Sequence, residues 1–399
     1  MTPPPPGSIP ATDSARGYRL LLDADETTLI HLVRPRRRAP APGGSHWDAV
    51  DRLARGHRLE PRLHRATTGE HDLPGIPAPL REAWRREYFT ALSAAVALLD
   101  QRDRAVRVLA ARGVRPLVVK GAALGGVLYP DPAVRPMGDL DLLLPRGSMA
   151  RLAGLPESLR EAGVDPGRFE IEEDHHDLTM DGIFPIELEA LWKTAVPAPF
   201  APAEAFVPCL EDQLLLTAVS CCRNGFWNLV LVLDAAEMIR QHGNRLDLNR
   251  LAERARNWRL DWALDTLLAL AAALFGEAAP AALRERLEPP ALRRRVLRNL
   301  LAGYRLHAGD GLAALNINRP AGAFALKYAV NHPGVVARQV RDFVLPRWSW
   351  MRAHYPHDSR AGLVGRYLAH PFVLAGVGVR LAASRVRTRS PRGVSPGRH

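Results

Sequence analysis

The chain has 399 residues, enough for two or three domains, and its 47% hydrophobic and 24% charged residues are typical of a globular protein. The formal net charge is +12, but seven arginines and no acidic residue lie in 361–399, so a core built to bind nucleic acid is not implied. No run approaches the ~18 consecutive apolar residues of a membrane span, the N-terminus lacks the apolar segment of a signal peptide, and the three cysteines lack metal-ligand spacing. We therefore expect a soluble cytoplasmic protein.

Changes in composition along the chain predict five regions. We expect a proline-rich, disordered or linker region at 1–45, leading helices at 46–112, a central core at 113–200, a helical domain at 201–345 and a C-terminal segment with a basic tail at 346–399. The fold class predicted is therefore α+β, with a small mixed sheet, flanking helices and a helical domain after it.

The core begins where a long predicted helix, about Leu80 to Arg112, leads into the short apolar strand Leu117–Val119. Lys120 and Gly121 then turn the chain into a helix that reaches about Leu128. Prolines at positions 130 and 132 end that helix, because proline lacks a backbone donor and restricts the residue before it.

A second strand, 138–144, carries Asp139 and Asp141. Alternate side chains of a strand share a face, so the two carboxylates point the same way while Leu140 and Leu142 point into the core. Two neighbouring carboxylates repel each other unless a cation lies between them, and Mg²⁺ prefers oxygen ligands. The pattern therefore predicts a metal-binding carboxylate pair beside a turn whose backbone N–H groups can bind phosphate.

After this strand we expect a helix from Met149 to about Ala162, with Ser148 as its N-cap, and then a β-hairpin. Its strands are predicted at 169–180 and 186–192, joined by a tight turn at 181–182. Glu187 and Glu189 share one face of the second strand. The adjacent His175 and His176 would point to opposite faces, so they do not form an obvious zinc site.

From Pro208 onward the sequence is helical, with two apolar helices broken near Asn224 and Gly225. Asp234 lies inside an apolar run of the second of these helices. A buried acid there is either paired for structural reasons or placed near the active site.

The stretch KGAAL…YPDP…RPMGDLDLLLP, followed by IELEALW, resembles the uncharacterised nucleotidyltransferase family, a branch of the DNA polymerase β-like nucleotidyltransferase superfamily. The resemblance covers about 45–360, but specific residues lie only in 117–192. The chain departs from the family pattern at Ala122, which stands where the superfamily has a small Ser or Gly, and at Glu189, which stands at the usual His position.

The resemblance implies an NTP-dependent enzyme with a nucleotidyltransferase core. It would move a nucleoside monophosphate from an NTP to an acceptor by a two-metal in-line displacement. Two Mg²⁺ ions would be held by Asp139, Asp141 and, as the third carboxylate, Glu187. Phosphates would be contacted by Lys120, Gly121, Ala122 and Arg135. ATP is the first expectation for the nucleotide and a small molecule or peptide for the acceptor, while the oligomeric state stays open.

Two other functions remain open from the sequence. The altered turn and Glu189 suit a catalytically inactive scaffold that keeps the fold and binds a partner, although the retained carboxylates argue against it. The arginine-rich terminus suits a nucleic-acid-binding tail, which would show salt-dependent affinity.

Overall fold

The computed structural model describes residues 9–13, 18–34, 46–68, 75–125, 127–173, 183–201, 203–306, 326, 328–346, 348, 351–352, 355 and 359–372. The chain divides into two compact units, Met1–His332 and Pro333–His399. The second unit contains α16 (Pro333–Val344) and a helical stretch at 360–372. The first unit holds the sheet and the residues that concern function. The domain boundaries expected inside it stay predictions.

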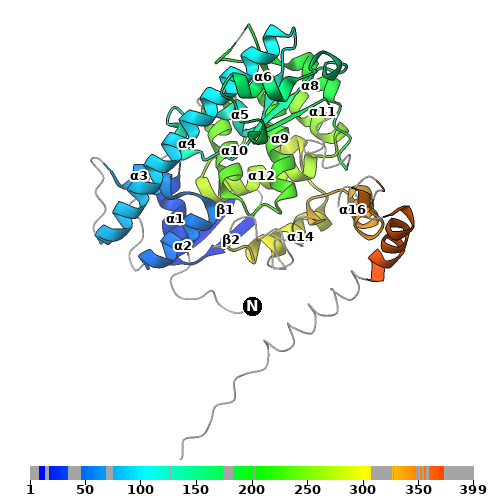
Figure 1. Ribbon diagram of the computed structural model, residues 1–399. Helices are drawn as coiled ribbons and strands as arrows, with labels where there is room; N and C mark the ends of the chain where they lie inside the picture. The colour runs from blue at the N-terminus through cyan, green and yellow to red at the C-terminus, as the bar shows by residue number, and fades with distance from the viewer. Residues whose placement is uncertain are drawn as a thin grey trace, which may run out of the picture. The chain divides into compact units, whose positions relative to one another are not determined.

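The first unit contains a mixed sheet, which lies near α5, α6 and α8 (Figure 1). Within the described residues it has five strands in the order β5-β4-β3-β7-β6. Their bounds are β3 (Leu117–Val119), β4 (Leu140–Leu143), β5 (Phe169–Glu172), β6 (Val196–Pro197) and β7 (Phe206–Val207). The pairs β3–β4 and β6–β7 are antiparallel, whereas β4–β5 and β3–β7 are parallel. This small mixed sheet, flanked and followed by helices, confirms the predicted α+β class.

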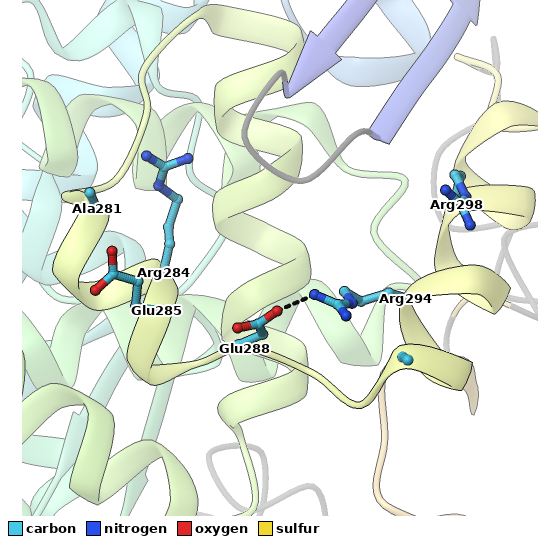
Figure 2. Close-up of a pocket in the computed structure, with 7 residues that line it drawn as sticks. Ala281, Arg284, Glu285, Glu288, Arg294 and Arg298 are labelled. Atoms are coloured by element: carbon cyan, nitrogen blue, oxygen red, sulfur yellow. Dashed lines mark hydrogen bonds and ion pairs between the residues drawn. The ribbon is translucent and has the colours of Figure 1, made fainter.

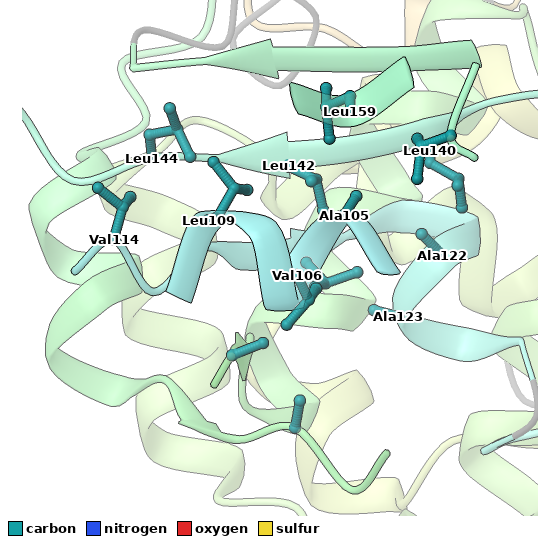
Figure 3. Packing of buried hydrophobic residues seen from close by; sticks show 14 of the residues in the cluster. Ala105, Val106, Leu109, Val114, Ala122, Ala123, Leu140, Leu142, Leu144 and Leu159 are labelled. Carbon is teal, nitrogen blue, oxygen red and sulfur yellow. The ribbon is translucent and has the colours of Figure 1, made fainter. Parts of the chain in front are cut away.

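The sheet packs against α4 (Ala78–Ala111), a helix of 34 residues, and against the short α5 (Lys120–Leu124). Figure 3 shows Ala105 and Leu109 of α4 on the side of the helix that faces Leu140 and Leu142 of β4. All four side chains are completely buried, so the sheet and α4 share one hydrophobic core. The predicted inward orientation of the two leucines is confirmed.

Helices precede and follow this core along the chain. The N-terminal side has the hairpin β1 (Ile9–Asp13) and β2 (Tyr18–Leu22), then α1 (Ala24–Val33), α2 (Trp47–His57) and α3 (Glu60–Thr67). The C-terminal side has α9 (Leu210–Arg223), α10 (Leu229–His242), α11 (Leu248–Asn257), α12 (Asp261–Leu270), a π-helical turn (Ala271–Phe275), α13 (Ala281–Arg286) and α14 (Ala291–Ala302). The helices α9, α10 and α12 contact one another, so the chain after the sheet is helical, as expected (Figure 1). Among the described helices, none has the length and hydrophobicity needed to cross a bilayer.

Four local predictions were wrong or incomplete. The stretch expected as a strand at 186–192 forms α8 (Leu188–Thr194), because its Leu, Glu, Ala and Lys residues are strong helix formers. The helix expected from Met149 is split into a 3-10 turn (Met149–Arg151) and α6 (Leu155–Glu161) by Gly154, whose φ is +68°. Ser148 makes no side-chain cap, and α5 ends at Leu124 rather than near 128.

Candidate active site

The register of three neighbouring strands brings the charged residues of the core together. In the β3–β4 ladder Val119 lies opposite Asp141, so Lys120, the next residue, leaves β3 beside the start of β4. In the parallel β4–β5 ladder Asp141 lies opposite Glu170. Lys120, Asp141 and Glu170 therefore gather at one end of the sheet.

Lys120 links the two carboxylates of this cluster. Its Nζ lies 2.6 Å from Oδ1 of Asp141 and 3.8 Å from Oε2 of Glu170. The Asp141 side chain is 3% exposed, that of Lys120 18% and that of Glu170 44%, so the cluster is closed at Asp141 and open toward solvent at Glu170. The buried Asp141 charge is tolerated because an ammonium group neutralises it.

Lys120 also has an unusual backbone. Its φ is +53°, in the left-handed region where a side chain clashes with the backbone at a cost of about 1–2 kcal/mol. Such strain persists where the surrounding structure imposes it, and it is common at functional sites. Here the strained residue joins β3 directly to α5.

The two aspartates of the Asp-x-Asp pair differ in environment. Asp139 precedes β4 and is exposed, whereas Asp141 is inside the strand and buried. The sequence predicted a shared face but not this difference in burial. The charge of Asp139 still acts on the interior, because it contributes to raising the pKa of Arg135.

Arg135 is bound to Asp234 of α10. Its Nη2 lies 2.7 Å from Oδ2 of Asp234, its Nε donates to the same carboxylate, and Tyr129 donates its hydroxyl to Oδ1 at 2.8 Å. Burial alone would lower the pKa of Arg135, but Asp234 and Tyr129 outweigh it and raise that pKa. Burial and the Asp234 charge raise the pKa of Tyr129 well above its usual value. Asp234 is thus structurally paired, the first of the two interpretations the sequence allowed.

The Arg135 guanidinium also closes over the turn. A Cβ at Gly121 would lie 2.5 Å from Nη1 of Arg135, so only glycine fits there in this arrangement. The predicted phosphate-contact residues Gly121 and Ala122 are both present in the first turn of α5, with Ala122 completely buried. The Arg135 guanidinium therefore lies against the turn and is paired with Asp234.

Arg102 of α4 binds the other end of α5, and no sequence pattern marked it as a site residue. Its Nη1 donates to the carbonyl oxygens of Ala122, at 3.0 Å, and Gly125, at 3.3 Å. Its guanidinium also lies 3.4 Å from the centre of the Phe200 ring. These contacts satisfy carbonyl groups at the C-terminal end of a helix that is too short to do so itself.

Glu187, the carboxylate that the resemblance assigned as third, belongs to a different cluster. It is the N-cap residue of α8 and lines a cavity of about 220 Å³ with Arg250, Arg254 and Trp258. Arg254 is paired with the buried Asp212 at 2.5 Å. Thus the described contacts group Asp141 with Lys120 and Glu170, and Glu187 with α11.

The other predicted features of the hairpin are placed as follows. Glu189 forms an exposed ion pair with Arg146, 3.0 Å long. His175, His176 and the turn at 181–182 lie outside the described residues. Among the described residues, no three His, Cys, Asp or Glu side chains are grouped closely enough to hold a metal ion by themselves.

A cavity of about 500 Å³ has no lining residue from the carboxylate strands. It lies between α13 and α14 and is lined by arginines and glutamates, among them Arg284, Arg298 and the ion pair Glu288–Arg294 (Figure 2). Figure 2 shows its charged side chains spread along the two helices. We assign it no role in the chemistry of Asp141.

The mixed sheet, the turn after β3 and the Asp-x-Asp strand define a nucleotidyltransferase-type core with helical flanks. Residues 43–276, more than half of the chain, match the family described as uncharacterised nucleotidyltransferase. The chain belongs to this family, and membership supports nucleotidyl transfer as its general activity. Neither a curated protein nor a solved structure matches the chain.

Proposed function

We propose that this protein uses Mg²⁺ to transfer a nucleoside monophosphate from an NTP, with ATP as the first candidate, to an acceptor hydroxyl. The proposal is supported by family membership and by one observation, the ion cluster of Lys120, Asp141 and Glu170 at the end of the strands that carry the Asp-x-Asp pair. We take the acceptor to be a small molecule or peptide, because seven of the arginines behind the net charge of +12 lie in 361–399 rather than in the core.

The residues of this cluster fit Mg²⁺ by their chemistry. Asp141 on β4 and Asp139 just before that strand would supply carboxylate oxygens, and Glu170, in register with Asp141, would supply a third. A positive charge, the Lys120 ammonium, already lies between Asp141 and Glu170. Since Mg²⁺ usually takes only one or two carboxylates and completes its shell with water and substrate phosphates, a preformed three-carboxylate cage is not required.

Bound Mg²⁺ would supply neutralisation of the phosphate charge and activation of the acceptor hydroxyl. The chain's own residues bind and orient the donor. The backbone N–H groups of Gly121 and Ala122, in the first turn of α5, are unpaired within the helix and can donate to phosphate oxygens. The Lys120 ammonium can donate to a phosphate while it keeps its contact with Glu170 or Asp141.

Arg135 positions this turn rather than the substrate. Its guanidinium is held by Asp234 and covers Gly121, so it keeps the backbone of the turn in place. This differs from the role that the resemblance implied, a direct phosphate contact. The two roles are distinguishable, because a positioning role predicts that Asp234→Asn also weakens donor binding.

The test is thermal stabilisation by each of the four common NTPs with Mg²⁺, which requires no known acceptor because a ligand that binds the native state raises Tm. We expect one NTP to raise the Tm of the wild type only when Mg²⁺ is present. Asp139→Ala/Asp141→Ala should lose this shift, while the exposed control Glu157→Gln should keep it. No shift with any NTP would overturn the proposal and favour the scaffold function.

The identity of the third carboxylate is tested with a matched pair of variants. Glu170→Gln and Glu187→Gln each remove one negative charge without changing size. If Glu170 is the third carboxylate, Glu170→Gln should lower the affinity for Mg²⁺–NTP, obtained from the Tm shift, about tenfold or more. Glu187→Gln should leave this affinity unchanged. The reverse result would restore the assignment from the resemblance.

A further inference from the structure

A small cavity lies next to the Asp-x-Asp strand, on the side of the leading helices. It has a volume of about 190 Å³ and is lined by α3, α4 and the segment that leads into β4. That segment contributes Pro136 and Met137. Met137 is two residues before Asp139, so at most about 7 Å of extended chain separates the cavity wall from that carboxylate.

The face of α4 that lines the cavity is made of small residues. Glu87, Thr90, Ala91 and Ala94 recur at the spacing of one helix face. Three of the four have short side chains, and this leaves the space open. The volume is below the roughly 300–1,000 Å³ of sites for drug-sized ligands, so it suits a single ring or a short chain rather than a nucleotide.

The chemistry of the cavity is dominated by Glu60, the first residue of α3. Glu60 is only 7% exposed. Within the described part of the chain no cation forms an ion pair with it, and its carboxylate accepts a hydrogen bond from its own backbone N–H. Burial, and then the charge of the nearby Glu87, raise the pKa of Glu60 despite the opposing effect of Arg55.

A neighbouring buried acid has the hydrogen-bond partners expected of a carboxylate with a structural role. Asp51 of α2 is 8% exposed and accepts hydrogen bonds from Nε of Arg55 at 2.8 Å and from Nε1 of Trp84 at 2.7 Å. Arg55, whose charge lowers the pKa of Glu60, is therefore already engaged with Asp51. Glu60 has no such set, although an uncompensated buried carboxylate is costly.

We propose that this cavity is the acceptor subsite and that it takes a compact organic cation, an amine carried on the same small molecule as the acceptor hydroxyl. This inference rests on the proposed function and names the class of its acceptor. Glu60 and Glu87 would bind the ammonium group, Thr90 offers a hydroxyl to the same ligand, and Met137 in the cavity wall is two residues before Asp139. Arg58, also at the cavity, is exposed and can remain in solvent.

The experiment compares two probes of the same ring size. D-Glucosamine carries a charged amine at neutral pH, whereas N-acetyl-D-glucosamine is neutral. We expect glucosamine to raise the Tm of the wild-type protein and N-acetylglucosamine to have little effect. Glu60→Gln/Glu87→Gln should weaken glucosamine binding about tenfold or more, since charge-assisted hydrogen bonds to both carboxylates are lost. Each shift is measured from the variant's own Tm without ligand.

The control is Glu82→Gln on the same helix, which removes an exposed acid that pairs with Arg85 outside the cavity. It should leave the glucosamine shift unchanged. Equal shifts with both sugars, an undiminished shift in the double variant, or no shift with glucosamine up to its solubility would overturn the inference.

The same Tm measurements separate this inference from the proposed function. Shifts with Mg²⁺ and NTP are measured in parallel, and the double variant should keep them, because neither glutamate belongs to the nucleotide cluster. If the NTP shift is absent while the amine-specific shift is present, the transferase proposal fails and the cation cavity stands. The opposite pattern would leave the donor site supported and remove the acceptor assignment.

Discussion

Two ion pairs flank the turn after β3, and they are built differently. Arg135–Asp234 is sealed, with side-chain exposures of 8% and 1% and two nitrogens on one carboxylate. In the Lys120–Asp141 pair the Lys120 Nζ donates to Oδ1 of Asp141, and this cation is 18% exposed and also lies near the solvent-facing Glu170. The sealed pair suits a structural role. In the open pair, Asp141 can exchange the Lys120 ammonium for another cation without unfolding of the core.

The largest expected effect comes from removing the sealed pair. Asp234→Ala leaves a buried guanidinium without its partner, which should destabilise the protein by about 3–5 kcal/mol. Asp141→Ala should cost only about 1 kcal/mol, because Lys120 retains Glu170 and can reach water. Urea unfolding of both variants measures the difference, and equal losses would contradict the distinction between the two pairs.

A second variant targets the turn between the pairs. Gly121→Ala places a methyl group 2.5 Å from Nη1 of Arg135 and should cost about 1–3 kcal/mol while it weakens Mg²⁺–NTP binding. Gly138→Ala is the matched control, because nothing lies within 4 Å of its added Cβ, and its stability should change by no more than about 0.5 kcal/mol. A neutral Gly121→Ala would show that Arg135 does not constrain the turn.

The strain at Lys120 can be separated from its charge. Lys120→Ala and Lys120→Gly both remove the ammonium, but only alanine keeps a Cβ at φ +53°. The glycine variant should therefore be the more stable of the two by about 1 kcal/mol in urea unfolding. Equal stability would mean that the turn relaxes once the ammonium is gone.

The smallest effect concerns Glu60, a buried carboxylate that, unlike the acids of both pairs, forms no ion pair with any described residue. Burial, Glu87 and Asp51 raise its folded-state pKa, against Arg55, so its ionised form opposes folding above that pKa. The penalty disappears as the pH falls below the unfolded-state value of 4.5. Glu60→Gln should thus stabilise the protein on the order of 0.5 kcal/mol at neutral pH and lose the advantage near pH 4, as followed by Tm against pH.

The sequence predicted the parts of the fold that depend on local patterns. The apolar run at β3, the alternation of Leu140 and Leu142 and the long α4 were all found as expected. It failed at α8, where alternation over a few residues competed with helix propensity. Such short stretches satisfy both patterns, and packing decides between them.

The site was predictable only in part for a physical reason. Asp139, Asp141, Lys120 and Gly121 are close in sequence, so their proximity follows from one strand–turn–helix unit. The position of Glu170 beside Asp141 depends on the register of two strands about 30 residues apart, and no local pattern sets that register. Arg102 was missed because an arginine on a long helix ordinarily indicates a solvated face.

The single helix α4 carries both Glu87 at the cavity wall and Arg102 on the carbonyls of α5. At 1.5 Å per residue these positions are roughly 22 Å apart along the helix, so α4 sets the distance between the cavity and the end of α5. Substitutions at positions 90, 91 and 94 would therefore change the selectivity for acceptors without changing the residues that bind the nucleotide. In such a scaffold one half of the reaction can evolve without re-optimising the other.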